Sequence, residues 1–148
     1  MLLDLRKLKR TGKQTTSFYF EYTPQDNLSE SLEGSEIASP IKISGEITLT
    51  GEHSAFVEGE IAFTIKGECT RCLEQTTKDF NASFAEAVSN DDEEGYELKN
   101  DTIDLSKIVD DAVLMNIPVQ FLCREDCKGL CSCCGTNLNY AQCECKKQ

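Results

Sequence analysis

The sequence predicts an α+β fold: an antiparallel β-sheet, either a meander or a partly open barrel, with one packed amphipathic helix and a cysteine-rich C-terminal tail. Apolar and polar residues alternate between positions 41 and 65, which is the pattern of half-buried strands. An apolar stripe of helical period follows between positions 103 and 115. Seven of the nine cysteines then lie between positions 123 and 145. We expect a single domain, with the sheet and helix in residues 1–122 and the tail, packed on the same domain, in residues 123–148.

Four strands are expected in the first 87 residues of the chain. Their apolar residues recur at every second position, so that each strand has one buried face and one solvated face. The turn between the two central strands is Thr50-Gly-Glu-His-Ser54. The polar segments 23–35 and 90–95 are predicted to be loops. The predicted strands span residues 17–22, 41–49, 57–65 and 75–87.

The helix is predicted from a change of period. Its apolar residues follow the spacing i, i+3, i+4, i+7, i+8, and we expect this stripe to pack on the apolar face of the sheet. Asp104 or Asp101 can cap the first turn, and Pro118 prevents the helix from continuing. The stripe consists of Leu105, Ile108, Val109, Ala112 and Val113.

The chain is acidic, with 26 acidic against 15 basic residues and a formal net charge of −11. Non-specific nucleic-acid binding by the whole surface is therefore disfavoured, because phosphates would be repelled. A local basic patch or a basic protein partner remains compatible with this charge. The N-terminal basic run, residues 6–13, is expected to be a solvated strand edge or a frayed arm, or else a contact to RNA or to an acidic partner.

A cytoplasmic protein is expected. Residues 1–10 interleave leucines with charges and lack the uninterrupted apolar run of a signal peptide. No segment approaches the roughly 18 apolar residues of a membrane-spanning helix. Thiols stay reduced in the cytosol, so clustered cysteines there are first interpreted as metal ligands.

The cysteines predict metal sites. Structural zinc takes four thiolate or imidazole ligands, and a Cys-x-x-Cys turn supplies two of them. Chain economy favours two four-cysteine sites, and Cys133 is then left over. The alternatives are to combine Cys69 and Cys72 with Cys131 and Cys134, or to bind a single zinc ion. The preferred sites are Cys69, Cys72, Cys123 and Cys127 for the first, and Cys131, Cys134, Cys143 and Cys145 for the second.

Other uses of the thiols fit the sequence less well than zinc. Disulfides conflict with a cytosolic location, whereas an iron–sulfur cluster also takes four thiolates. Redox chemistry at Cys69-Thr-Arg-Cys72 lacks the usual strand-to-helix setting. A catalytic zinc site needs an open position and a nearby base, and the one histidine, His53, falls in the predicted hairpin turn.

These motifs together resemble the YceD family of bacteria and plastids. The resemblance is carried by Cys69-Thr-Arg-Cys72-Leu73, by the helix ending in Leu114-Met-Asn-Ile-Pro118, and by the tail string from Cys123 to Asn139. That string is Cys-x3-Cys-Lys-Gly-Leu-Cys-x2-Cys-Gly-x-Asn-Leu-Asn, and Cys133 stands in it where a non-ligand residue is expected. The resemblance implies a role in the accumulation of large-subunit ribosomal RNA, without a catalytic activity, in a bacterial cytoplasm.

The functional expectation is therefore a non-enzymatic ribosome-assembly factor with two zinc ions. Its expected partner is large-subunit ribosomal RNA or a basic ribosomal protein, with no membrane and no small-molecule substrate. The alternative is a cytosolic thiol redox protein or a zinc-dependent protein-interaction module unrelated to ribosomes. Residues expected to contact RNA or another partner are Arg6, Lys7, Lys9, Arg10, Arg71, Arg124 and Lys128.

Overall fold

The structure, a computed structural model, describes residues 1–24, 32, 34–38, 40–91 and 95–145. Within these ranges the chain forms one eight-stranded sheet, a short N-terminal helix and a longer helix that packs on the sheet. The elements are β1 (Leu2–Asp4), α1 (Arg6–Thr11), β2 (Thr15–Tyr22), β3 (Ser35–Ile37), β4 (Ile41–Leu49), β5 (Ser54–Glu68), β6 (Gln75–Ser89), β7 (Tyr96–Lys99), β8 (Thr102–Asp104) and α3 (Leu105–Asn116).

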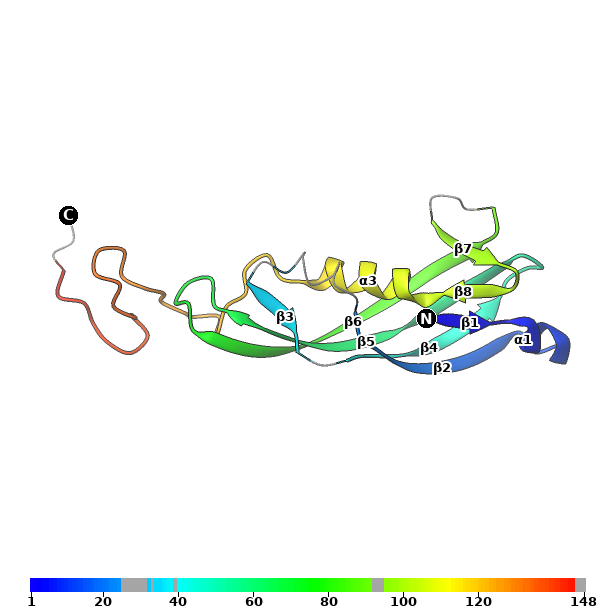
Figure 1. The fold of residues 1–148 in the computed structure, drawn as a ribbon, viewed down its shortest axis with the longest axis horizontal. Helices are drawn as coiled ribbons and strands as arrows, with labels where there is room; N and C mark the ends of the chain where they lie inside the picture. Colours follow the sequence, from blue (N-terminus) through cyan, green and yellow to red (C-terminus); the bar gives the residue numbers. More distant parts are fainter. Residues whose placement is uncertain (25–31, 33, 39, 92–94, 146–148) are drawn as a thin grey trace.

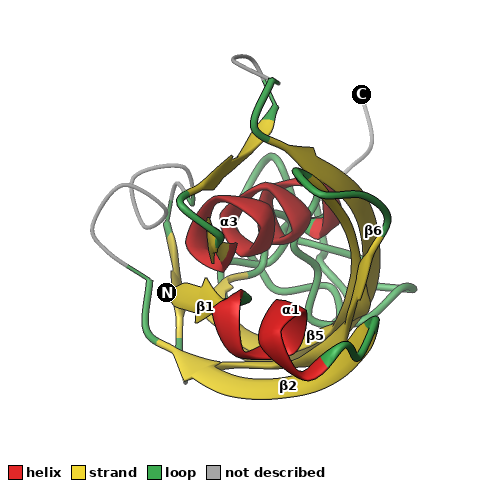
Figure 2. Ribbon diagram, turned by 90° about the vertical axis from the view of Figure 1, so that its right-hand side faces the viewer, coloured by secondary structure: helices red, strands yellow, loops and turns green. Residues whose placement is uncertain are grey.

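The sheet runs in the order β1-β8-β7-β6-β5-β4-β2, and β3 pairs with β5 beside this path. All pairs are antiparallel except β6 with β7. Strands β5 and β6, each 15 residues long, form a hairpin that runs most of the length of the molecule (Figure 1). Seen from the α1 end, the sheet curls around α3 as an open half-barrel (Figure 2). The predicted fold class is therefore confirmed.

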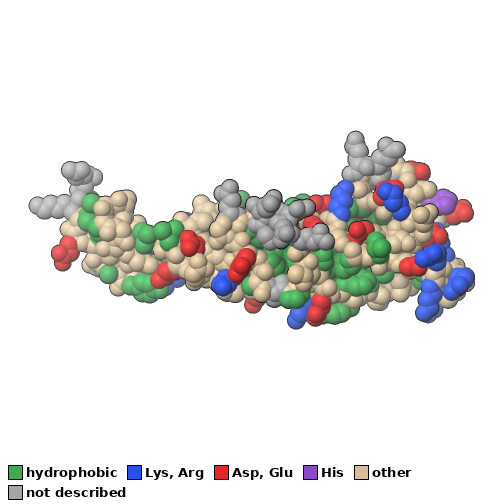
Figure 3. All heavy atoms as spheres, in the orientation of Figure 1, with side chains coloured by type: hydrophobic (Ala, Val, Ile, Leu, Met, Phe, Trp, Pro, Cys, Tyr) green, Lys and Arg blue, Asp and Glu red, His purple; other side chains and the backbone are tan. Residues whose placement is uncertain are grey.

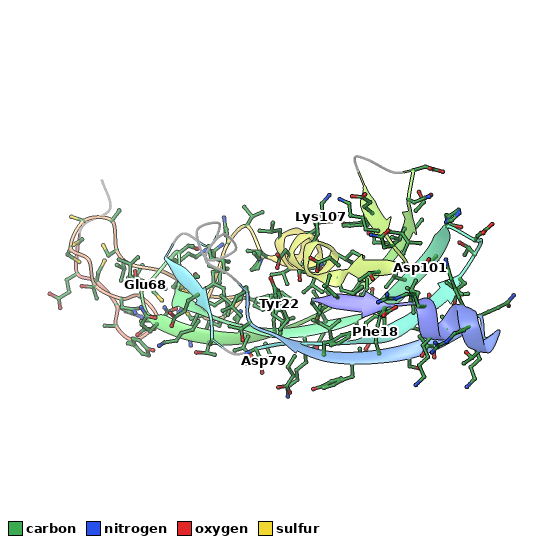
Figure 4. All side chains as sticks on the ribbon, turned by 45° about the vertical axis from the view of Figure 1, so that its right-hand side comes forward. Phe18, Tyr22, Glu68, Asp79, Asp101 and Lys107 are labelled. Carbon is green, nitrogen blue, oxygen red and sulfur yellow. The ribbon has the colours of Figure 1, made fainter. Side chains whose placement is uncertain are left out.

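Helix α3 fills the concave side of the sheet. All five residues of its predicted stripe are buried, together with inward residues of β4, β5 and β8. Asp104 is the N-cap: its carboxylate accepts a hydrogen bond of 2.9 Å from the Ser106 N–H. The helix begins two residues later than the start of the apolar pattern, because Ile103 pairs with Leu3 and Leu98 in the sheet. At the β2 edge of the sheet, the hydroxyl of Tyr22, labelled in Figure 4, donates to Asp110 of α3 at 3.3 Å.

Two glycines let the middle of the sheet curl tightly. Gly45 and Gly59 face each other in the β4–β5 ladder, and Phe18 and Phe84 follow on the outer sides of the same row. A Cβ atom at Gly45 would lie 2.2 Å from the Glu58 carbonyl oxygen and 2.8 Å from Cζ of Phe18. The two aromatic rings thus take the space above the glycines, and a side chain there would force the strands apart.

The N-terminal residues are more ordered than expected. Strand β1 forms the edge of the sheet against β8, but it ends before the basic run begins. Most of that run, Arg6–Thr11, is helical, so the expectation of a strand edge or a frayed arm is wrong for these residues. Leu5 and Leu8 explain the difference, because both are buried in the core and anchor α1 on the sheet. The Lys9 ammonium pairs with Asp101 and donates to the Glu52 carbonyl.

The hairpin turn at 50–54 lies where the alternation predicted it. Of the two predicted loops, positions 25–31, 33 and 92–94 lie outside the described residues, so the interpretation of those positions stays a prediction. Ser35, expected to end the first loop, instead begins β3. Neither helix in the described ranges has the length and apolar character that a membrane span requires.

Candidate metal centres

The first cysteine quartet joins the far end of the sheet to the segment after α3. Cys69 and Cys72 lie in the turn between β5 and β6, and Cys123 and Cys127 follow the helix. All four sulfur atoms lie within 4.8 Å of one another; the Cys69–Cys127 and Cys72–Cys123 Sγ–Sγ distances are 3.7 and 3.6 Å. A tetrahedral zinc with bonds of about 2.3 Å places its sulfurs about 3.8 Å apart. The quartet therefore fits a four-thiolate metal ion with little movement. Figure 4 shows sulfur atoms gathered at this end of the molecule, beyond Glu68.

Backbone amides point at the sulfurs of this quartet. Cys69 accepts hydrogen bonds from the N–H groups of Cys123, Cys72 and Arg71. The Leu73 N–H donates to the Cys69 carbonyl at 2.9 Å, and Leu73 has a φ of 59°. Leu73 thus occupies the left-handed position that glycine takes in such turns.

The second quartet repeats this turn in the tail. The sulfurs of Cys131, Cys134, Cys143 and Cys145 also lie within 4.8 Å of one another. Cys131 accepts hydrogen bonds from the N–H groups of Cys134 and Cys133, and the Gly135 N–H donates to the Cys131 carbonyl at 2.9 Å. Gly135 has a φ of 73°, as expected of the glycine in a Cys-x-x-Cys-Gly turn. The structure thus groups the eight cysteines in the two sets preferred from the sequence.

The two quartets differ in burial. Cys69, Cys72 and Cys127 are buried, with Leu122 and Leu130 packed beside them. In the second quartet, by contrast, Cys134 is exposed and the other three are half-buried. Figure 1 shows the tail extending beyond the end of the β5–β6 hairpin. Cys133 is exposed and belongs to neither quartet, and none of the nine cysteines forms a disulfide.

The thiols of the first quartet differ in acidity. Burial acts to raise the pKa of Cys69, but hydrogen bonds from the Cys123, Cys72 and Arg71 N–H groups outweigh it and lower this pKa to about 6. The Glu74 N–H acts to lower the pKa of Cys72, but burial and the other three thiols raise it to about 12.

The second quartet has the same asymmetry. Hydrogen bonds from the Cys134 and Cys133 N–H groups lower the pKa of Cys131 to about 6. The side chains of Cys134 and Cys133 raise the pKa of Cys145 to about 12. Four thiols this close cannot all ionise unless a cation compensates their charge. The chemistry of both donor sets therefore suits a divalent metal ion.

The basic residues selected from the sequence form two separate groups. Arg71, Arg124 and Lys128 surround the first quartet: Arg71 donates to the Cys127 carbonyl at 3.1 Å, and Arg124 pairs with Asp126 at 3.6 Å. The N-terminal group, residues 6–10, lies on α1 at the opposite end of the molecule (Figure 3). The structure therefore does not combine the seven residues into one surface.

Asn139 was missed as a site residue. Its side-chain amide donates to Cys127 Sγ at 3.3 Å, and its Oδ1 accepts from the Lys128 N–H at 2.8 Å. The first of these bonds is the largest cause of a lowered pKa of Cys127. The sequence signal was its position at the end of the Cys-Gly-x-Asn-Leu-Asn string, but the string does not say which sulfur the amide meets.

The chain is similar to several known proteins. An uncharacterised Mycobacterium bovis protein is 34% identical over 91 residues, which are 55% of this chain and 44% of that protein. The uncharacterised protein YlbN of Bacillus subtilis is 29% identical over 138 residues, 85% of this chain and 76% of that one. The Arabidopsis thaliana protein named large ribosomal RNA subunit accumulation protein YCED homolog 1, chloroplastic, is 41% identical over 46 residues, 31% of this chain and 14% of its own length.

The chain thus spans less than half the length of the mycobacterial relative. No solved structure matches it. A family model described as large ribosomal RNA subunit accumulation protein YceD matches residues 57–148, which is more than half of the chain and contains both quartets. The chain therefore belongs to the YceD family.

Proposed function

We propose that this protein is a non-enzymatic ribosome-assembly factor that supports the accumulation of large-subunit ribosomal RNA in a bacterial cytoplasm. One observation carries the proposal: the family match over residues 57–148 contains every cysteine of both quartets. The family description and the printed name of the Arabidopsis relative both refer to accumulation of the large ribosomal RNA subunit. The quartets thus belong to the part of the chain that the family shares.

Each quartet is proposed to hold one zinc ion. The sulfur spacing of 3.6 and 3.7 Å in the first quartet supports a tetrahedral four-thiolate ion. When bound, zinc supplies a cross-link between chain segments. The protein supplies the amide hydrogen bonds that reduce the charge on the sulfurs. Native mass spectrometry tests this directly: two zinc ions per chain are expected, whereas iron would indicate clusters and no metal would overturn both centres.

The metal centres are proposed to be structural. The four cysteines of each quartet would take all four positions of a tetrahedral ion and would leave no open position for a water or a substrate. A thiol redox role is the alternative, and thiol titration separates the two. Metal-bound cysteines react slowly until a chelator is added, whereas a free redox pair reacts at once. Cys133, exposed and outside both quartets, should react at once in either case.

A basic ribosomal protein is the favoured client. Glu46 and Glu58 are directly opposite each other in the β4–β5 ladder, and Glu60 follows on the same convex face. All three are exposed, and they line a depression of about 410 Å³ that also includes Ser17 and Ser44. Like charges in directly opposed positions destabilise a sheet. Their presence supports a partner that brings positive charge to this face.

The test is affinity capture from a bacterial extract with the tagged chain at moderate salt. Recovery of a basic large-subunit ribosomal protein is expected. Recovery of ribosomal RNA alone would show that the chain binds RNA and not a ribosomal protein. Absence of both would overturn the proposed function. Neutralising the three glutamates with glutamine should reduce capture at least several-fold without lowering the melting temperature, because an unfavourable charge pair is removed.

The matched control neutralises three exposed acidic residues elsewhere, Asp91, Glu125 and Glu144, and so makes the same change in net charge. Capture by this control should remain near that of the wild-type chain. If the control loses capture and the sheet variant keeps it, the client binds the tail and not the convex face.

A further inference from the structure

The loop of the second quartet folds back on the first quartet. Leu130 and Asn137 form an antiparallel bridge, and the Leu138 N–H donates to the Gly129 carbonyl at 2.9 Å. Gly129 has a φ of 72°, and a Cβ there would lie 3.0 Å from the Arg71 carbonyl oxygen, in the turn of the first quartet. Residues 129–130, which follow Cys127, are thus paired on one side with residues 137–138 of the tail. On the other side they pack against Arg71, in the turn between β5 and β6.

Asn139 makes the contact that reaches a sulfur atom. Its Nδ2 donates to Cys127 Sγ at 3.3 Å, and its Oδ1 accepts from the Lys128 N–H at 2.8 Å. Its own backbone N–H donates to Oδ1 of Asn137 at 3.0 Å, which fixes the direction of the loop. One side chain from the second loop therefore contacts both a sulfur of the first quartet and the backbone amide of the residue that follows it.

The loop that carries Asn139 has no core of its own. Between positions 135 and 142, no residue is buried, and Tyr140 is 74% exposed. The hydroxyl of Tyr140 donates to Glu74 at 3.1 Å, but this contact lies at the surface. What fixes the loop is therefore the quartet at its two ends, Cys134 and Cys143, together with the hydrogen bonds to the first quartet.

We infer that Asn139 couples the two proposed metal centres, so that filling the second centre strengthens metal binding at the first. A metal ion that joins Cys134 to Cys143 orders the loop and places the amide of Asn139 on Cys127. The amide stabilises the thiolate there, because hydrogen bonds to a charged sulfur reduce its charge. By linkage, filling the first centre strengthens binding at the second by the same factor. Hydrogen bonds to charged groups correspond to roughly a tenfold to hundredfold effect on affinity.

The experiment measures the zinc affinity of the first centre by competition with a chromophoric chelator. The wild-type chain is compared with the double variant Cys143→Ser and Cys145→Ser, which removes the second centre. Asn139→Asp is added to each, and Asn139→Leu serves as a second variant of different chemistry. Gln142→Glu is the control, because it makes the same amide-to-carboxylate change at an exposed position of the same loop.

Removing the second centre should weaken zinc binding at the first roughly tenfold to hundredfold in the wild-type chain. When Asn139 is already replaced, removing the second centre should change the zinc affinity of the first less than about threefold, because the contact that couples the two centres is then absent. Gln142→Glu should leave the coupling intact. Absorption of the cobalt(II)-substituted protein separates an effect on the sulfur from a loss of folding. The sulfur-to-cobalt charge-transfer band of the first centre should shift in both Asn139 variants and not in the control.

This inference rests on the proposed metal centres, and its failure can be told from theirs. Two bound zinc ions whose affinities are independent would overturn the coupling and leave the centres in place. Equal coupling with and without Asn139 would overturn the role of this residue. A wild-type chain that binds no metal would overturn the centres and the coupling together, and client capture is measured separately from all of these.

Discussion

Loss of the first metal centre is expected to destabilise the whole domain. Cys72 and Cys123 are 51 positions apart, and the segment between them contains β6, β7, β8 and α3. A cross-link that closes a loop of this length stabilises the folded state by about 4 kcal/mol through the entropy of the unfolded chain. The change Cys72→Ser should remove most of this. For a chain of this size, a loss of that magnitude lowers the melting temperature by roughly 8–16 °C.

Loss of the second centre should affect the sheet much less. Cys134 and Cys143 are only nine positions apart, and a loop of that length corresponds to about 3 kcal/mol at most. Most of that stabilisation stays in the tail, because no residue between positions 131 and 145 is buried in the core, and only the coupling through Asn139 reaches the first centre. The change Cys145→Ser should therefore shift the melting of the sheet by a few degrees only.

The assay combines thermal unfolding by circular dichroism with metal content by native mass spectrometry. Cys133→Ser is the matched control, since it makes the same substitution at an exposed cysteine outside both quartets. It should keep two metal ions and the wild-type melting temperature. The reasoning fails if Cys72→Ser loses a metal ion yet melts within about 2 °C of wild type. Loss of metal from Cys133→Ser would instead show that the ligand sets are wrongly assigned.

Three further predictions concern the fold. Gly45→Ala should lower the free energy of unfolding in urea by about 3 kcal/mol or more, because the new Cβ would lie 2.2 Å from the Glu58 carbonyl oxygen. Gly51→Ala is the control and should lower it by under about 1 kcal/mol, because the new Cβ faces the Ser54 hydroxyl, which can rotate away. Leu73→Gly should raise the free energy of unfolding, measured in urea, by about 0.5 kcal/mol, since it relieves a φ of 59° at a side chain that is 60% exposed. A lower free energy of unfolding would contradict this. Asp104→Asn keeps the N-cap acceptor but removes the charge that faces the Met1 ammonium and the helix N-terminus, and should lower the free energy of unfolding by about 0.5–1 kcal/mol at pH 7. Partial burial acts to raise the pKa of Asp104, but hydrogen bonds from the Met1 ammonium and the Ser106 N–H lower it. The contribution of the carboxylate to the free energy of unfolding is therefore fully present above the ordinary carboxyl pKa. It is lost as the pH falls through the lower pKa of the folded state. The difference from wild type should therefore shrink below about pH 4, and a constant difference would refute the assignment.

Local patterns predicted the elements that are regular over many residues. The alternation in β4 and β5 and the stripe of α3 depend on the periods of strand and helix, which the sequence displays directly. The Cys-x-x-Cys turns are equally local, because four consecutive residues bring two sulfurs together. Short elements gave no such signal: β1, β7 and β8 have three or four residues each and are strands only because they pair with one another and with β6.

The sequence by itself determined the half-buried sheet, the helix that covers it and the cysteine pair of each Cys-x-x-Cys turn, since near neighbours along the chain carry that information. Which pairs combine was only a preference from the sequence, because Cys72 and Cys123 are 51 positions apart. Tertiary structure decided what distant segments do to each other. Register alone placed Glu46 opposite Glu58 and Gly45 opposite Gly59. Only the return of the tail put Asn139 on Cys127, 12 positions earlier, where one amide joins two centres that the sequence presents as separate. Such contacts depend on three-dimensional position, and no local period encodes them.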